Sequence, residues 1–283
     1  MSWDELLNHG DEPFDLSFPS VRGVHPSLTL KATVVQACDD QDGALPDSLT
    51  DCEMTRQTDA GHAQFAKYMR SKMVSRPRLN AAVKHFQLVL DQCPASHPDH
   101  AAALTNLAWA RLKGYTQNHL QDIDTTISLF RDALALRPQH HPNHPLSLYN
   151  LTKALTCRHR KKSTAADIRE SAQLHHELLP LCPEGTYLRS IAAGENGVDY
   201  VIDECNKLPT DASDEGICLR QVVLDLCPVG HPRRPRALDK LSDALESRFT
   251  QSGNIDDLDE CIQFRHEAVS LCPEGHTDRD VYL

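Results

Sequence analysis

The sequence lacks the long apolar runs that a membrane-spanning protein needs. None of its 283 residues lies in an apolar stretch near the ~18 residues that cross a bilayer. The start, Met1 to Asn8, is acidic and has no basic region before an apolar one, which argues against a secretory signal. Aromatic residues make up only 5%, and the 12 glycines are too few for a turn-rich sandwich or barrel. Because leucine and alanine dominate instead, we expect a helical protein. Because a secretory signal is missing, we expect it in the cytoplasm.

Signatures of common enzymes and of nucleic-acid binders are missing as well. The chain has no glycine-rich phosphate loop, no Gly-x-Ser-x-Gly elbow and no dinucleotide fingerprint. Its 29 basic residues are outnumbered by 40 acidic ones, which gives a formal net charge of −11 and no basic footprint. We therefore expect a non-enzymatic protein without a cofactor or a metal, and without a nucleic-acid or membrane partner.

The acidity is concentrated in the N-terminal segment. Eleven acidic residues lie within residues 1–54, against only two basic ones, Arg22 and Lys31. Prolines recur throughout this segment, and only Leu28 to Cys38 has a pattern that favours one short helix or strand. We expect residues 1–54 to be mostly disordered and residues 55–283 to form the folded domain.

A dipeptide that ends in proline recurs with an almost constant period. The steps between successive copies are 44, 45, 45 and 45 residues, and the copies are Cys93-Pro94, Arg137-Pro138, Cys182-Pro183, Cys227-Pro228 and Cys272-Pro273. A second marker, His-Pro, follows in phase at His97, His141 and His231. Self-similarity at such a period is typical of repeat architectures.

Each unit has the pattern of two helices, which we name A and B. The A segment follows His-Pro and carries apolar residues at steps of three, as in Leu104, Leu107 and Ala110. We expect the proline of His-Pro to occupy the start of helix A. The B segment, with Ile123 and Ile127 as an example, ends where the next Cys-Pro proline interrupts the hydrogen-bond ladder.

These patterns predict an all-α fold, an α-solenoid of about five stacked helical hairpins. One hairpin cannot bury its apolar stripe alone, so neighbouring hairpins share it. The first A segment, near His62 to Met73, lacks the leucine motif. The fourth contains Gly194 and Gly197, which predict a break in the helix and a kink or loosening of the array.

The leucine-rich A segments, the connector from Gln251 to Glu260 and the ending Leu271 to His276 resemble the tetratricopeptide-like (TPR-like) arrays of fungal proteins. The resemblance covers about four fifths of the chain, although the period exceeds the usual 34 residues and equals that of HEAT repeats. It implies protein–protein interaction. Such arrays accompany caspase-like CHAT protease or NTPase domains, so the alternative function is that of a regulatory, autoinhibitory fragment of a larger signalling or protease system.

The favoured function is a scaffold that binds a peptide or protein on the concave face formed by the A helices. Polar or large residues beside the A motif are the candidates for this groove: Asn106, Trp109, Tyr149, Asn150, Lys153, Lys240 and Asp243. Asn106, Asn150 and Lys240 occupy one repeat column, which is polar in every clear copy. An amide or ammonium group there can bond a ligand backbone or a neighbouring helix.

The histidines and cysteines are better explained by structure than by chemistry. No Cys-x-x-Cys or His-Glu-x-x-His pattern supports zinc, and only the group from His140 to His144 merits a test with that metal. The His-Pro histidines recur at each helix start, which indicates a capping role. The repeated cysteines, such as Cys182 and Cys227, are expected to be small buried apolar residues without disulfides.

Two further segments carry predictions. The basic run Arg158 to Lys162 is expected in the A–B connector, either as an import signal or phosphate contact or as a solvated loop. The chain stops after Leu283, where a sixth A helix is due, so the last B helix would expose Leu258, Ile262 and Val269. We therefore expect self-association through the last repeat, or a natural truncation of a longer array.

Overall fold

The computed structural model describes residues 14–17, 27–30, 45–71, 76–118, 122–194 and 196–272. The chain divides into two compact units, Met1–Asp51 and Cys52–Leu283. In the first unit, β1 (Phe14–Ser17) pairs antiparallel with β2 (Ser27–Leu30), with Phe14 opposite Leu30. No pattern in the sequence predicts β1, whereas β2 overlaps the start of the Leu28–Cys38 stretch, for which a short helix or strand is expected. The rest of that stretch lies outside the described residues.

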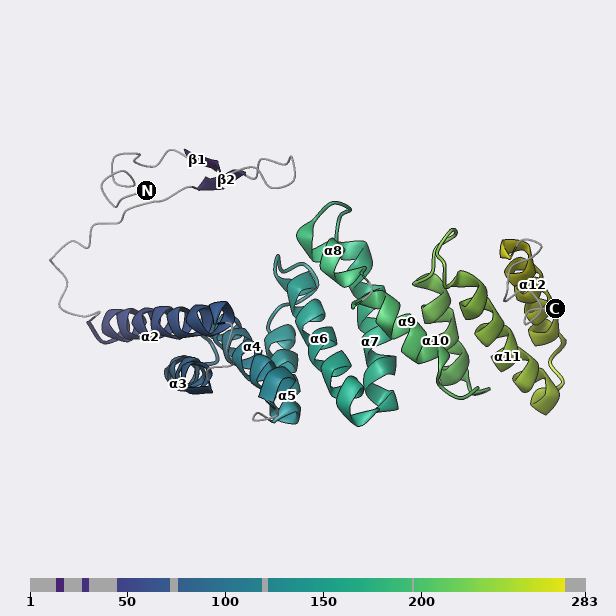
Figure 1. The fold of residues 1–283 in the computed structure, drawn as a ribbon, viewed down its shortest axis with the longest axis horizontal. Helices are drawn as coiled ribbons and strands as arrows, with labels where there is room; N and C mark the ends of the chain where they lie inside the picture. The colour runs from purple at the N-terminus through teal and green to yellow at the C-terminus, as the bar shows by residue number, and fades with distance from the viewer. Residues whose placement is uncertain are drawn as a thin grey trace. The chain divides into compact units, whose positions relative to one another are not determined.

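The remaining elements are helices in hairpins that follow one another along the chain (Figure 1). The A helices are α2 (Leu45–Arg70), α4 (His100–Asn118), α6 (His144–Lys162), the pair α8 (Tyr187–Ala192) and α9 (Val198–Asn206), and α11 (Arg234–Ser252). The B helices are α3 (Arg76–Gln92), α5 (Ile123–Ala135), α7 (Ala165–Leu178), α10 (Asp214–Asp225) and α12 (Ile255–Leu271). A short 3-10 helix, η1 (Leu179–Leu181), extends α7.

Every apolar cluster in the described residues draws on helices from more than one repeat. One cluster joins α2, α3 and α4 through residues such as Phe86 and Leu107. The next joins α4, α5 and α6 around Phe130, and a third brings α6, α7 and α8 together. The largest extends from α7 to α12. Helices α4 and α5, α6 and α7, and α11 and α12 pack as hairpins, and α3, α5, α7 and α10 each pack against the following helix A, so the predicted α-solenoid is confirmed.

The helix ends follow from local sequence, with one correction. Helices B end just before the Cys-Pro or Arg-Pro dipeptide, as expected. Helices A begin two residues later than predicted, at His100, His144 and Arg234. The marker histidine explains the delay, because in each case its Nδ1 accepts the backbone N–H two residues on and so closes a turn. The three N–H donors, at 3.0–3.2 Å, belong to Asp99, Asn143 and Arg233.

The fourth A helix is interrupted, as its glycines predicted. The break lies between Ala192 and Val198. A Cβ at Gly197 would lie 2.2 Å from the carbonyl oxygen of Ala192, so only glycine fits there without a shift of the backbone. The stack continues past the break, because both α9 and α10 pack against α7.

Candidate protein-interaction site

The candidate residues on α4 lie at the surface of the second hairpin. Trp109 is half-buried, and its ring meets that of Phe130 edge-on, with centroids 6.0 Å apart. The ammonium of Lys113, one turn further along, lies 6.0 Å from the Trp109 ring centroid. Asn106 is also half-buried. This part of α4 therefore offers an aromatic surface beside a positive charge.

Asn150 does not lie where a ligand would touch it. The residue is 1% exposed, and neither its side-chain nitrogen nor its oxygen has a hydrogen-bond partner. The sequence predicts that this repeat column faces the groove, but on α6 its side chain turns into the protein. An unpaired buried amide costs free energy. Asn150 therefore packs inside the protein at an energetic cost and does not face an open groove.

Lys240 and Asp243 are engaged with residues of the last hairpin. The Lys240 ammonium lies 2.7 Å from a carboxylate oxygen of Asp243 and 3.3 Å from one of Asp239. Asp243 also pairs with Arg265 of α12 at 3.4 Å. Because these charges already neutralise one another, α11 offers little unpaired charge to a ligand.

Tyr149 and Lys153 come together in a pocket at the break between α8 and α9. They lie one turn apart on α6, and the opposite wall is formed by Ser190, Ile191, Gly194 and Asn196. The pocket has a volume of about 320 Å³. A continuous helix would not place Gly194 and Asn196 in this way, so the interruption itself shapes the pocket. The sequence revealed the break but gave no sign that its residues meet Tyr149 and Lys153.

The ammonium of Lys153 carries an unneutralised charge. Among the residues that the structure describes, it has neither an ion pair nor a hydrogen bond. Burial lowers its pKa, and the neighbouring positive charges of Arg160 and Lys113 act in the same direction. Burial likewise raises the pKa of Tyr149. The pocket therefore combines a cation, a phenol and an apolar wall, which suits an acceptor group of a bound chain.

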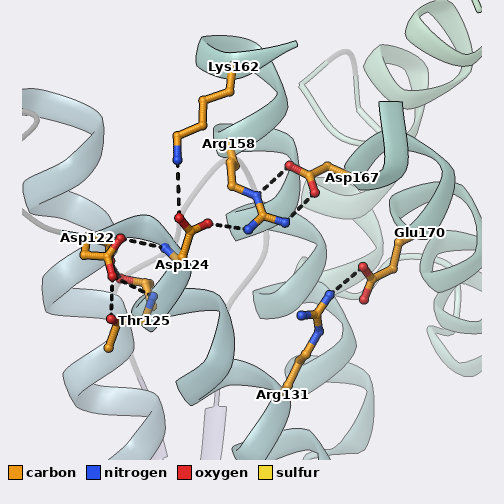
Figure 2. A network of polar contacts seen from close by, with 9 residues as sticks. Asp122, Asp124, Thr125, Arg131, Arg158, Lys162, Asp167 and Glu170 are labelled. Carbon is orange, nitrogen blue, oxygen red and sulfur yellow. Dashed lines mark hydrogen bonds and ion pairs between the residues drawn. The ribbon is translucent and has the colours of Figure 1, made fainter. Parts of the chain in front are cut away.

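The basic run is not in a connector, which corrects the sequence interpretation. Residues 158–162 form the last turns of α6, where cations favour the negative helix end. Arg158 donates to both oxygens of Asp167 at 2.5 and 2.7 Å and to Asp124 at 2.5 Å, as Figure 2 shows. Lys162 reaches Asp124 at 3.3 Å. These charges therefore join the second and third repeats.

The rest of the run reaches repeats on both sides. The Arg160 guanidinium stacks 4.1 Å from the ring centroid of Tyr200, on α9. Lys161 donates to the carbonyl of Tyr115, on α4, at 2.5 Å. His159 is buried, and its Nε2 lies 3.3 Å from Glu204. Packing between neighbouring repeats thus accounts for residues that could also have been read as an import signal.

The same arginine clamp recurs in the last hairpin. Arg248 donates to both oxygens of Asp257 at 2.6 and 2.8 Å and to Asp214 of the preceding repeat at 2.9 Å. Each of these residues lies 90 positions after its counterpart in the Arg158 cluster. The bidentate geometry fixes the end of helix A on the start of helix B. The arginine and its two aspartates recur at the same spacing in the sequence, but the spacing alone did not identify the clamp.

The cysteines match their predicted structural role. The repeated set is buried at 5% exposure or less: Cys93, Cys182, Cys227 and Cys272. All the described cysteines are free thiols. Burial raises the pKa of Cys205 and of Cys227 to about 12, so these thiols stay protonated and unreactive at neutral pH.

Metal-ligand clusters and membrane-spanning helices are both absent from the residues that the structure describes. Within residues 45–272, apart from the gaps given above, no three His, Cys, Asp or Glu side chains converge as metal ligands. In the same part of the chain, no helix combines the length and apolarity that crossing a membrane requires.

Helix pairs of constant period, cores shared between neighbours and repeated side-chain columns define an α-solenoid. No family model and no curated protein matches the chain.

Solved structures of helical repeats resemble it distantly. One is a kinesin light chain-like protein of Podosopora anserina with nearly identical TPR-like repeats; it is 15% identical over 76% of this chain and 97% of that one, with a TM-score of 0.40. Another is the designed helical repeat protein DHR64, which is 12% identical over 78% and 95%, with a TM-score of 0.30.

Proposed function

We propose that this protein is a non-enzymatic scaffold that binds a peptide segment of a partner on the face formed by its A helices. The concave surface of a solenoid is the usual place for such recognition. One observation carries the proposal: Tyr149 and Lys153, selected from the sequence as groove residues, line one pocket with the break in the fourth A helix. A half-buried ammonium without a carboxylate partner is a ready donor for a peptide carbonyl or carboxylate.

The aromatic surface of α4 extends this site. Lys113 and Lys153 are close enough to influence each other electrostatically, so Trp109 and its neighbour Lys113 lie near the pocket. A bound peptide would place an apolar side chain against Trp109 and a carbonyl or acidic group near Lys153. Aromatic anchors beside charged groups are typical of the residues that dominate binding energy at interfaces.

A peptide selection tests the proposal directly. A random peptide library displayed on phage is selected against the full-length protein, and the enriched peptides are measured by fluorescence anisotropy. We expect Lys153→Gln to weaken binding about tenfold, the loss of one charge-assisted hydrogen bond. The control Lys84→Gln removes the same charge from an exposed position on α3 and should leave binding unchanged. If no peptide is enriched, or if Lys153→Gln and Lys84→Gln bind the enriched peptides equally well, the proposal is wrong.

The autoinhibitory alternative, the cytoplasmic location and the fungal origin stay predictions of the sequence. No contact in the described structure favours the autoinhibitory role over the scaffold. Self-association through the last repeat is a separate proposal, which concerns α12.

A further inference from the structure

Arg137 departs from the pattern of its own repeat column. The equivalent residue is cysteine in each of the other four copies, at positions 93, 182, 227 and 272. Those cysteines are small and buried, and Arg137 is buried almost as deeply, at 6% exposure. A long cation therefore replaces a small apolar side chain at one interface of the solenoid. Burying a charge is costly, so the exception calls for a compensating partner.

The protein supplies that partner only in part. One terminal nitrogen, Nη1, donates to the hydroxyls of Ser147 at 2.9 Å and Thr105 at 3.2 Å. Among the described residues, no carboxylate pairs with the guanidinium, and Nε and Nη2 have no hydrogen-bond partner. These two nitrogens are not sealed from solvent. Burial lowers the pKa of Arg137, in keeping with a cation that lacks a counter-charge.

Arg137 lines a pocket of about 310 Å³ between two successive His-Pro turns. The turn before α4 contributes Ser96, His97 and Asp99, and the turn before α6 contributes His141. Since the Nδ1 of His141 accepts the N–H of Asn143 at 3.0 Å, the proton of the neutral ring lies on Nε2, which is a further donor. The pocket thus has Arg137 and His141 as donor residues, and the carboxylate of Asp99 is the opposing group.

We propose that this pocket binds a phosphate group, held by the free N–H groups of Arg137 and the Nε2–H of His141. Guanidinium donors arranged as a fork match the oxygens of phosphate, and the pocket is large enough for the group and part of its carrier. Bound phosphate would neutralise the buried charge of Arg137 without displacing its two hydroxyl partners. The site lies on the turns between helices B and A, so it does not depend on the peptide site at Lys153.

The test is a titration of the full-length protein with inorganic phosphate, followed by the backbone amide signals of the two turns in NMR spectra. We expect saturable shifts at both turns, and no comparable shifts with acetate. A Gly-phosphoserine-Gly peptide distinguishes the sources: tighter binding than phosphate points to a phosphorylated protein partner, and equal binding points to the free ion. Shifts that do not saturate, or acetate shifts as large as those with phosphate, would overturn the proposal.

Variants separate binding from folding. Arg137→Cys restores the residue of the other repeats, so it should melt cooperatively while binding phosphate at least about tenfold more weakly. The matched control Arg236→Cys removes a charge from an exposed position on α11 and should bind normally. His141→Asn keeps an acceptor for the Asn143 N–H, as in an Asx turn, yet removes the Nε2 donor, and it should also weaken binding.

A gain of affinity provides the sharpest outcome, because misfolding cannot cause it. Asp99→Asn removes the negative charge that faces the pocket and keeps the size of the side chain. We expect this variant to bind phosphate several-fold more tightly. If affinity is unchanged in both Asp99→Asn and Arg137→Cys, phosphate binds elsewhere and the proposal is wrong.

Discussion

A single buried column in the middle of helix B shows how residues differ between repeats. The column holds Phe86 and Phe130 in the first two hairpins, but His175 in the third and Arg220 in the fourth. All four residues are at most 3% exposed. The imidazole of His175 shares a hydrogen bond of 3.0 Å with the carbonyl of Ser171, which lies on the same helix. A polar side chain in an apolar column must find such partners within its own repeat.

Arg220 finds its partners at the end of the interrupted helix. Its guanidinium donates to the carbonyls of Cys205 at 2.7 Å and Leu208 at 2.9 Å. These carbonyls lie at the end of α9, at Asn206, where a helix leaves its last carbonyls short of intrahelical donors. The arginine therefore caps the end of α9, which a phenylalanine at this position could not do.

His175 makes stability depend on pH. Burial lowers its pKa from 6.5 to about 4. Below pH 6.5 the unfolded chain binds a proton at this ring, whereas the folded chain stays neutral until about pH 4, so stability falls as the pH falls through this window. The contribution lost is roughly 3 kcal/mol.

We expect His175→Phe, which restores the residue of the first two repeats, to lower the pH dependence of unfolding. Urea denaturation between pH 7.5 and pH 4 measures it. Carboxylates also titrate in this window, so the difference between the variant and the natural protein is the informative quantity. Parallel stability curves for the two proteins would contradict the assigned role of His175.

The arginine clamp is a second feature of single residues with a measurable consequence. The Asp167 side chain is 1% exposed, so Arg158→Ala would leave a buried carboxylate without its bidentate partner. We expect the free energy of unfolding to fall by about 3 kcal/mol in urea denaturation. Arg248→Ala should act in the same direction but less strongly, because Arg248 is more exposed, at 30% against 18%. A loss below about 0.5 kcal/mol for Arg158→Ala would place it with ordinary surface pairs.

Among the elements, α12 is the helix B that lacks a following helix A in the described part of the chain. Ile262 is 46% exposed, whereas its counterparts Ile127 and Ala172 are at most 1% exposed. Ile255, at the start of the same helix, is 61% exposed. Of the stripe expected on α12, Ile262 is thus open as predicted, whereas Leu258 and Val269 are half-buried. We propose that a second copy of the chain covers this stripe.

Ile262→Glu tests self-association at this helix. Light scattering should show a mass that rises with protein concentration for the natural chain, and a monomer for the variant, because a buried glutamate would oppose the contact. Ser128→Glu adds the same charge at an exposed position of α5 and should leave association intact. A monomer at every concentration, unchanged by Ile262→Glu, would show that the helix is not an interface between copies.

For the whole molecule, the point where the repeats begin has a practical consequence. Helix α2 begins at Leu45, so a cut at the expected boundary after residue 54 would fall inside it and remove Met54, which is 7% exposed. We expect a protein without residues 1–44 to keep its helical circular dichroism and cooperative melting. A protein without residues 1–54 should melt at a lower temperature. Loss of cooperative melting in the shorter deletion would show that the solenoid needs the N-terminal segment.

The sequence predicts more of the fold than of the candidate site. Period, helix pairs and buried cysteines could be predicted, because they depend on spacing and on prolines that act locally. Among the groove candidates, Tyr149 and Lys153 were placed together, but Asn150 is buried and Lys240 is paired. The position within the repeat does not show whether a residue lines a pocket, is buried or is paired, since equivalent positions meet different neighbours in each repeat.

The sequence by itself determined a solenoid of five helical hairpins and the break in the fourth A helix. Each follows from apolar periodicity, proline or glycine within a few residues. Only the tertiary structure decided which charges pair, as Arg158 does with Asp124, and which pockets form, as at Lys153 and Arg137. Those contacts join residues about one repeat apart in the chain, and their distances are set by how neighbouring hairpins pack, which no local pattern specifies.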